Sequence, residues 1–387
     1  EFIEEAAELC RFHFGNNTAF NRKGWEYILS QHGGRLPVAI KAVPEGSLVE
    51  VDNVLFTVIN TDPNCAWITS YLETVLSKIW ASCYVATLSR ECKQTLKRYL
   101  DDSSDNLGGL DFMLHDFGCR STSSEEAAGI LGLAHLINFK GTDTFPALKV
   151  AKDYYAADLT SLGFSVPALE HTLMCALGQK GEIDVVRGLL KKYPLGILSV
   201  VGDSYDYCNF VENYIGHVLR DEILSRNGVF VVRPDSITPE FPTPEELTLW
   251  TFESLWSNFG GVTNSKGFRV LRPQIGVLWG DGIDKDGIEK ILIKLVQNKF
   301  SVEKIVFGMG SALLQKCHRD LQRNAFKCSA QCRNGTWYDV YKEPKDASKT
   351  SKRGKFKLVY DEQNGGVLVT VPETDPRPDQ LVTVFEN

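Results

Sequence analysis

The sequence contains no Cys-x-x-Cys pair, although it has ten cysteines among its 387 residues. The two closest are Cys328 and Cys332. This scatter argues against a disulfide framework and against a zinc site. It is typical of reduced, buried thiols in a cytoplasmic protein.

Long hydrophobic runs are also missing. The most apolar stretch, residues 67–86, is interrupted by Glu73 and Lys78, so it does not predict a transmembrane helix. The chain opens directly in an amphipathic helix pattern, without an initiator methionine, an N-cap residue or a signal peptide. We therefore expect no membrane partner and a chain that starts partway through a larger protein.

An excess of basic residues is absent as well. The formal net charge is −7 and the sequence pI is about 5.6, which argues against nucleic acid as a partner. Any phosphate-binding surface must therefore be local. The length allows a large core and predicts two or three domains, unless an α/β barrel takes up most of the chain.

What the sequence does contain is a repeated format, in which an apolar strand-like run leads into a polar loop and then into a helix. Apolar strands that alternate with helices predict a parallel sheet covered on both faces. In barrels of this type the loops after the strands converge on one end, which carries the active site. The six runs are Phe112–Leu114, Leu136–Phe139, Ile197–Val201, Val229–Val232, Ile275–Trp279 and Ile305–Phe307.

The flanking regions predict a smaller α+β domain. Residues 1–12, 18–32 and 62–100 have helical spacing, and residues 36–58 alternate like a small antiparallel β unit. Near the end, a basic loop at 342–357 is followed by a hairpin that turns at Asn364-Gly365.

We therefore predict an α/β fold in three parts. They are an N-terminal α+β part (1–108), a (β/α) barrel-like catalytic domain with parallel strands (109–330), and a C-terminal basic loop and β-hairpin that pack on the N-terminal part (331–387).

The chemistry is predicted around Glu170 and His171. A short apolar strand before them ends at Pro167, because proline lacks an N–H group, so the pair lies at the start of the following helix. An imidazole that is partly exposed beside a carboxylate titrates near neutral pH. A histidine that merely caps a helix is the alternative, and the polar loops elsewhere in the predicted barrel argue against it.

Two glycine-rich turns predict a phosphate site. Gly280-Asp281-Gly282 and Gly308–Ser311 each precede a helix, whose first backbone N–H groups attract anions. Backbone geometry alone also explains glycine in such turns. Arg233 and Asp235, at another strand end, suit a phosphate or an aromatic ring and sugar hydroxyls.

Asp143 and Phe117 predict recognition of a neutral aromatic ligand. A buried Asp143 carboxylate favours a ligand that donates hydrogen bonds and repels one that carries another carboxylate. Phe117 is suited to stack on a flat ring. The alternatives are a helix cap for Asp143 and a core position for Phe117.

Motifs of one family occur in order along essentially the whole chain. They are Lys41–Gly46, Asn53–Val58, His115–Gly118, Asn138–Thr144, Ser165–Pro167 with Glu170-His171, Asp203–Asp206, Arg233–Ser236, Asn264–Gly267, Gly280–Gly282, Leu313–Lys316 and Phe326–Ser329. Together they resemble the nicotinamide phosphoribosyltransferases, members of the type II phosphoribosyltransferase family close to the nicotinate phosphoribosyltransferases.

The resemblance implies transfer of the phosphoribosyl group of PRPP to nicotinamide, giving NMN and pyrophosphate in NAD salvage. It also implies Mg²⁺ with PRPP and ATP, ATP as a co-substrate, and a homodimer with sites at the interface. His171 is then the residue that ATP phosphorylates, and the other catalytic residues are Glu170, Asp203 and Asp235.

For substrate binding, the resemblance implies Asp143 at the amide, Phe117 on the pyridine ring with Arg233 nearby, and Arg120 at the ribose phosphate. It also implies roles for a larger set of residues. These are Gly280, Asp281, Gly310, Ser311 and Arg319 around the 5′-phosphate and ribose, Lys327, Lys342 and Lys349 facing pyrophosphate, and Ser199 as a further substrate contact.

The sequence departs from the family pattern in three places. We expect the chain to lack a further N-terminal segment, which in the family helps to complete the site across the dimer interface and adds an aromatic residue to the pyridine pocket. Ser311 stands where the family usually has glycine, and Cys119 replaces a common aromatic. Two alternatives stay open, namely a non-catalytic homologue that binds ligands or forms dimers, and nicotinate as the substrate.

Overall fold

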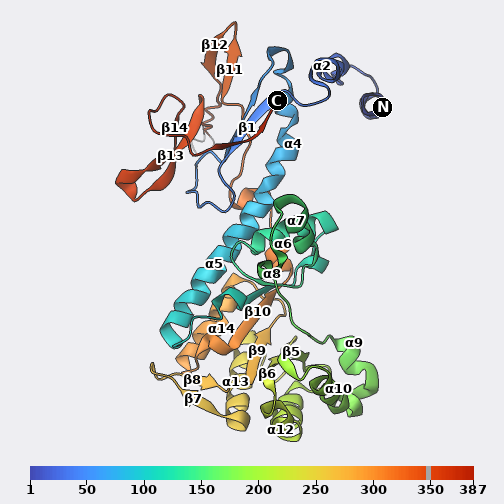
Figure 1. Ribbon diagram of the computed structural model, residues 1–387, viewed down its shortest axis with the longest axis vertical. Coiled ribbons are helices and arrows are strands. Elements are labelled where there is room, and N and C mark those ends of the chain that lie inside the picture. The colour runs from blue at the N-terminus through green and yellow to red at the C-terminus, as the bar shows by residue number, and fades with distance from the viewer. Residues whose placement is uncertain (346–349) are drawn as a thin grey trace. The chain divides into compact units, whose positions relative to one another are not determined.

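The computed structural model describes residues 1–345 and 350–387, and these divide into two compact units (Figure 1). Unit 1 comprises Glu1–Trp80 and Gln322–Asn387, and unit 2 comprises Ala81–Leu321. The unit borders therefore lie at 80/81 and 321/322, whereas the sequence pattern placed them at 108/109 and 330/331. The three-part division stays a prediction.

Unit 2 is built on a six-stranded parallel sheet with the order β4-β3-β10-β9-β6-β5. The predicted α/β fold with barrel-like parallel strands is confirmed. The strands are β3 (Leu114–Asp116), β4 (Gly141–Thr142), β5 (Leu195–Val201), β6 (Asn227–Arg233), β9 (Ile275–Trp279) and β10 (Ile305–Met309).

One short segment links the two edges of this sheet. Phe164 forms a parallel bridge with Gly141 in β4, and Ala168 forms one with Ser199 in β5. The Phe164 N–H group donates to the Lys140 carbonyl oxygen at 2.7 Å, and the Ser199 N–H group donates to the Pro167 carbonyl oxygen at 3.0 Å. Because residues 164–169 bond to both edges, the sheet curls into a barrel-like ring.

Helices connect the strands of unit 2 and share one hydrophobic core with the sheet. Helix α6 (Glu125–His135) is capped at its start, where the Ser124 side chain accepts from the Ala127 N–H group. The other helical elements are α5 (Trp80–Ser103), α7 (Pro146–Tyr155), α8 (Leu159–Leu162), α9 (His171–Met174), α10 (Gly178–Lys192), α11 (Tyr207–Asn209), the π-helical η6 (Phe210–Val218), α12 (Arg220–Leu224), α13 (Pro244–Phe259), α14 (Lys285–Gln297) and α15 (Ser311–Leu314). A small antiparallel pair, β7 (Gly261–Thr263) and β8 (Arg269–Leu271), completes the unit.

The prediction of a strand at Leu136–Phe139 was wrong. Leu136 is the C-cap of α6, with its N–H group on the Gly132 carbonyl, and Asn138 turns back to the His135 carbonyl. The apolar run therefore ends a helix, and β4 follows after it. Phe112, in the first predicted run, likewise lies in a 3₁₀ turn before β3 begins.

Unit 1 contains a three-stranded antiparallel sheet with the order β15-β1-β2. This sheet confirms the predicted antiparallel β unit, and it pairs the C-terminal strand with the N-terminal part. The strands are β1 (Val38–Ala42), β2 (Phe56–Asn60) and β15 (Val382–Glu386). The predicted hairpin is also confirmed as β13 (Phe356–Asp361) and β14 (Val367–Pro372), while the pair β11 (Ala330–Arg333) and β12 (Thr336–Asp339) was not predicted.

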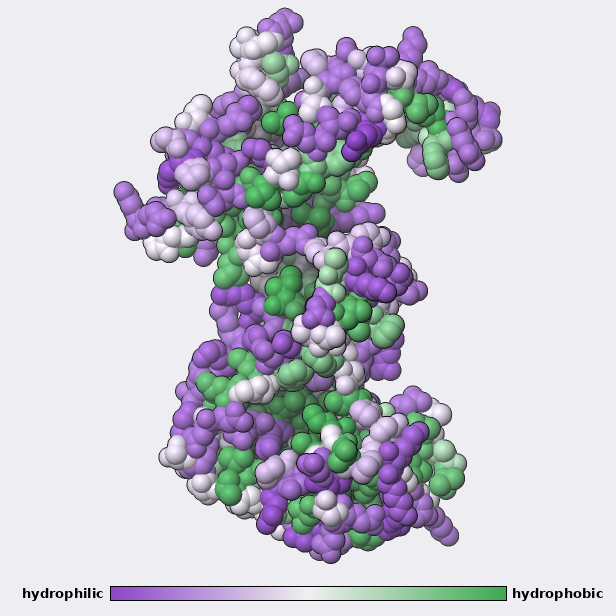
Figure 2. Space-filling model, in the orientation of Figure 1, coloured by the Kyte–Doolittle hydropathy of each residue, from purple (hydrophilic) through white to green (hydrophobic). Residues whose placement is uncertain are grey.

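The helices of unit 1 are short and partly exposed. They are α1 (Phe2–Phe14), α2 (Arg22–His32), α3 (Ile68–Tyr71) and α4 (Glu73–Leu76). Hydrophobic side chains reach the surface over the N-terminal helices (Figure 2), where Phe2 is 85% and Phe12 is 68% exposed. Every helix among the described residues is too short or too polar to cross a lipid bilayer.

The cysteines are all free, but most are not buried. Only Cys65 and Cys92 are fully enclosed, and the expectation of buried thiols was wrong for the other eight. Three cysteines are exposed: Cys175 in a 3₁₀ turn, Cys328 in the irregular chain before β11, and Cys332 in the two-stranded β11–β12 pair.

Candidate active site

The predicted site residues of unit 2 follow the ends of its parallel strands. Because these strands run in one direction, their C-terminal ends lie at the same rim of the barrel-like sheet. Phe117 and Arg120 follow β3, Asp143 follows β4, Glu170 and His171 follow the closing segment, Asp203 follows β5, Arg233 and Asp235 lie at the end of β6, Gly280 and Asp281 follow β9, and Gly310 and Ser311 follow β10.

His171 is held by a carboxylate from the neighbouring loop. Its Nε2 lies 2.8 Å from Asp203 Oδ1, and the Ser236 hydroxyl donates to Asp203 Oδ2. The Asp203 side chain is 6% exposed, whereas the imidazole is 44% exposed. Glu170 supplies the N-cap position of α9 without a side-chain cap. The arrangement fixes one ring nitrogen and presents the rest of the ring to solvent.

Two further carboxylates lie near this pair. Asp235 Oδ1 accepts from the Arg233 guanidinium, with Nη2 at 3.0 Å. Partial desolvation, followed by the negative charges of Asp235 and Asp203, raises the pKa of Asp281. The three carboxylates therefore act on one another, and together they attract a positive charge.

Phe117 rests on the two glycine-rich turns. A Cβ atom at Gly308 would come within 2.1 Å of the Phe117 ring, and one at Gly280 within 3.3 Å. The Phe117 N–H group donates to the Met309 carbonyl at 2.9 Å, which fixes the ring beside β10. Close approach of this ring therefore explains the glycine at position 308.

Asp143 is exposed. Its side chain accepts from the Ser165 hydroxyl, and its N–H group donates to the Asp116 carbonyl at 2.9 Å. Asp116 is fully buried, and its Oδ1 accepts from the Gly118 N–H group at 2.7 Å. Burial raises the pKa of Asp116 to about 6. Asp116 thus joins the backbone of the Phe117 turn to that of Asp143.

The predicted phosphate turn is closed by a hydroxyl pair. Gly310 occupies the N-cap position of the four-residue helix α15, and the Ser311 and Ser121 hydroxyl oxygens lie 2.9 Å apart. Arg120 is exposed, and the Arg319 guanidinium lies 3.1 Å from neighbouring Asp320.

The remaining predicted residues lie elsewhere. Ser199 is buried in the middle of β5, at 3% exposure, where its backbone bonds to the closing segment. Lys327 and Lys342 are exposed in unit 1. Lys349 lies outside the described residues.

Sequence reasoning missed four residues that contact or adjoin the predicted set. Ser165 and Ser236 lie within the family motifs, but the sequence carries no sign of the carboxylates that they contact. Asp116 was likewise inside the His115–Gly118 motif. Glu182 is buried on α10 at the spacing of Val186 and Leu190, and a carboxylate on an apolar helix face was the available signal.

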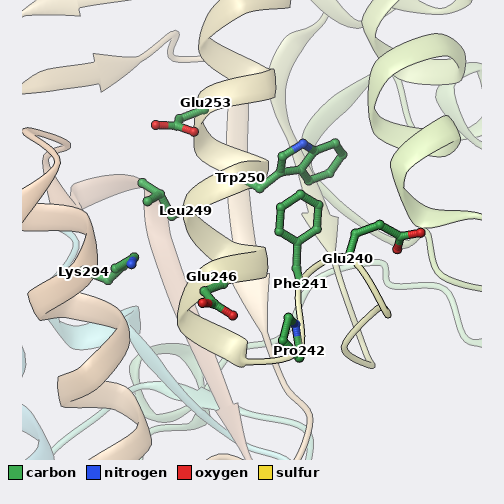
Figure 3. A pocket seen from close by; sticks show the side chains of 8 residues that line it. All are labelled: Glu240, Phe241, Pro242, Glu246, Leu249, Trp250, Glu253 and Lys294. Carbon is green, nitrogen blue, oxygen red and sulfur yellow. The ribbon is translucent and has the colours of Figure 1, made fainter.

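Two other features lie apart from these residues. A surface pocket formed by residues 240–242, α13 and α14 brings two aromatic rings and three glutamates together (Figure 3). Its lining is Glu240, Phe241, Pro242, Glu246, Leu249, Trp250, Glu253 and Lys294. Among the described residues, the one trio with metal-ligand chemistry is His32, Asp62 and Cys65 in unit 1. Asp62 there already accepts from His32, Tyr27 and the Asn64 N–H group. These hydrogen bonds explain the position of the carboxylate without a metal ion.

Comparison with known proteins gives a consistent set of matches. Residues 112–386 match the nicotinate phosphoribosyltransferase (NAPRTase) family, and residues 1–40 match the nicotinamide phosphoribosyltransferase N-terminal domain. The chain is 40% identical to a nicotinamide phosphoribosyltransferase of Xanthomonas campestris pv. campestris (strain 8004), over 100% of this chain and 82% of the relative. It is 34% identical to one of Acinetobacter baylyi, over 94% of this chain and 75% of the relative.

Among solved structures, nicotinate-nucleotide pyrophosphorylase from Pyrococcus furiosus has a TM-score of 0.56 with 14% identity. That likeness covers 91% of this chain and 75% of the other. At this identity it shows a shared fold alone.

Proposed function

The chain belongs to the nicotinate phosphoribosyltransferase family, and from this premise we propose that it transfers the phosphoribosyl group of PRPP to nicotinamide. The products are NMN and pyrophosphate, in NAD salvage. The observation that carries the proposal is that the His171–Asp203 pair, Phe117 and Asp143 all follow strand ends at one rim.

In the proposed reaction the pyridine nitrogen attacks the anomeric carbon of PRPP, and the bond from that carbon to pyrophosphate breaks. Phe117 stacks on the pyridine ring, and Asp143 accepts a hydrogen bond from the amide. The carboxylates of Asp203, Asp235 and Asp281 stabilise the cation-like ribose, because negative charge held at the reacting carbon favours the transition state. Mg²⁺ enters with PRPP, as part of the substrate.

We assign the substrate phosphates to the loops that carry cations and glycine-rich turns. Arg120, Gly310, Ser311 and Arg319 surround the 5′-phosphate, and Arg233 lies beside the ring. Lys327, Lys342 and Lys349 face pyrophosphate, an assignment that rests on the family resemblance. The reaction requires the attacking nitrogen and the leaving group to lie in line.

ATP is proposed to phosphorylate His171. Nε2 is occupied by Asp203, so Nδ1 is the nitrogen that takes the γ-phosphoryl group, with ADP leaving. Hydrolysis of the phosphohistidine then couples ATP consumption to turnover. Phospho-peptide mass spectrometry after incubation with ATP identifies the residue.

We also propose a cytoplasmic homodimer. Ten free thiols fit a reducing compartment, and the exposed phenylalanines of α1 are candidates for burial against a second copy. Sedimentation velocity measures the oligomeric state directly.

Product analysis tests the central proposal. Purified protein is incubated with PRPP, Mg²⁺ and either nicotinamide or nicotinate, with and without ATP, and NMN is measured by mass spectrometry. We expect NMN, and more of it with ATP. Product from nicotinate alone would make nicotinate the substrate, and no product from either would favour a non-catalytic homologue.

A further inference from the structure

A buried carboxylate bonds to both of the turns that carry Phe117 and Asp143. Asp116 is the last residue of β3 and is completely covered, and its Oδ1 accepts from the Gly118 N–H group at 2.7 Å. This bond closes a short turn around Phe117. The Asp116 carbonyl oxygen accepts from the Asp143 N–H group at 2.9 Å. One residue therefore holds the turn after β3 and the turn after β4.

The surrounding backbone leaves room for this carboxylate. A Cβ atom at Gly118 would lie 3.0 Å from Asp116 Oδ1, and one at Gly132 in α6 would lie 3.1 Å from Oδ2. Each carboxylate oxygen thus lies against a glycine. Oδ2 has no hydrogen-bond partner among the described residues, and such a group is costly to bury. A role beyond stability explains why a carboxylate occupies this position.

We propose that Asp116 is a positioning residue for the nicotinamide pocket. The Phe117 N–H group is already bound to the Met309 carbonyl, so the Asp116–Gly118 bond fixes the other side of the Phe117 residue. Because the Asp116 carbonyl also holds Asp143, a shift of this turn displaces both groups together. The inference rests on the proposed function, in which Phe117 stacks on the pyridine ring and Asp143 accepts from the amide. Asp116 itself is fully covered and acts only through these two residues.

Hydrogen exchange tests the positioning without any turnover. The wild-type protein is compared with Asp116→Ala, which removes the acceptor of the Gly118 N–H group, and with Asp116→Asn, whose amide oxygen can replace it. Peptide mass spectrometry measures exchange in residues 117–121 and 141–145. We expect at least tenfold faster exchange in both segments of D116A, and rates within twofold of wild type in D116N. Unchanged exchange in D116A would overturn the inference.

The matched control is Ser103→Ala, which also removes a buried acceptor from a backbone N–H group. Ser103 Oγ accepts from the Val302 N–H group at 3.2 Å, before β10 begins, at the end of the sheet opposite the rim. We expect faster exchange around Val302 and none in the two rim segments. Equal acceleration of the rim segments in S103A and D116A would mean general destabilisation and would reject a positioning role. Asp116→Leu, of similar shape, replaces D116A if that variant does not fold.

Kinetics separates a positioning role from a loss of folded enzyme. We expect D116A to raise the KM for nicotinamide at least fivefold, to leave the KM for PRPP within twofold, and to lower the preference for nicotinamide over nicotinate. D116N should restore all three quantities. A purely structural role lowers kcat in proportion to the folded fraction and leaves both KM values and the preference unchanged. That result would contradict the inference.

The two measurements also separate this inference from the proposed function. Exchange that changes as expected, in a chain that makes no NMN, would retain Asp116 as the residue that positions both turns and would reject the proposed reaction. NMN formation with unchanged exchange in D116A would reject the positioning role alone.

Discussion

Among single side chains, the rim holds two kinds of carboxylate. Asp203 is held by His171 and Ser236 from other loops, Asp235 is held by Arg233 two residues before it, and both carboxylates are largely covered. Asp143 is exposed and accepts from the Ser165 hydroxyl, so a ligand that donates a hydrogen bond can share it. A carboxylate that can still accept a hydrogen bond is suited to distinguish a ligand that carries an amide from one that carries a carboxylate.

Asp143→Asn should therefore reduce the preference for nicotinamide over nicotinate. The amide side chain removes the repulsion of the nicotinate carboxylate and offers a donor in its place. We expect the ratio of the two kcat/KM values to fall about tenfold, which corresponds to about 1.4 kcal/mol. Steady-state kinetics with both substrates measures it, and Asp153→Asn, an exposed acid paired with Lys149, is the control. Unchanged selectivity would remove Asp143 from the pyridine pocket.

Among helices and strands, the sequence was most informative where one pattern had one explanation. Ile275–Trp279 is the whole of β9, because an apolar run bounded by Pro273 and Gly280 has no room for a helix. The run Leu136–Phe139 was wrongly predicted to be a strand, because the end of a buried helix is as apolar as a strand. The β11–β12 hairpin could have been predicted from the Asn334-Gly335 dipeptide. Both residues have positive φ, as a tight hairpin turn requires.

The sequence predicted those parts of the site that lie directly after the parallel strands. His171, Asp203 and Asp235 could be placed at one rim because loops after parallel strands converge. The partners of these residues could not be assigned from local patterns. Ser236 reaches Asp203 across 33 positions of sequence. Glu182 is buried only through the packing of α10.

Helix α6 supports the site from beneath, since Gly132 lies against the Asp116 carboxylate. Ser124→Ala should destabilise this helix, because the Ala127 N–H group loses its acceptor. We expect a loss of about 1 kcal/mol in the free energy of unfolding, measured by urea denaturation. Ser123→Ala, one residue before the cap, is the matched control. Equal effects of the two substitutions would show that the cap contributes nothing specific.

For the whole molecule, buried ionisable groups make stability depend on pH in opposite directions. Burial raises the pKa of Asp116 to about 6 and, together with Asp206 and Asp203, that of Glu182 to about 7. Both acids bind protons more tightly in the folded state, so their contribution is lost as pH rises through these values. Burial lowers the pKa of His135 to about 4, so its contribution is lost as pH falls from about 6.5 towards 4.

Glu182→Gln isolates one of these contributions. Between pH 5 and pH 8 the folded wild-type protein must either ionise the buried Glu182 carboxyl group or keep it protonated, and both reduce its stability relative to the unfolded chain. The glutamine side chain of E182Q does not titrate, so it carries neither cost. The stability of E182Q relative to wild type should therefore increase over this range, by on the order of 2 kcal/mol. Urea unfolding at pH 5, 6, 7 and 8 measures the difference, and Asp184→Asn should give a difference that does not vary with pH. A constant difference for E182Q would mean that Glu182 is ionised throughout this pH range.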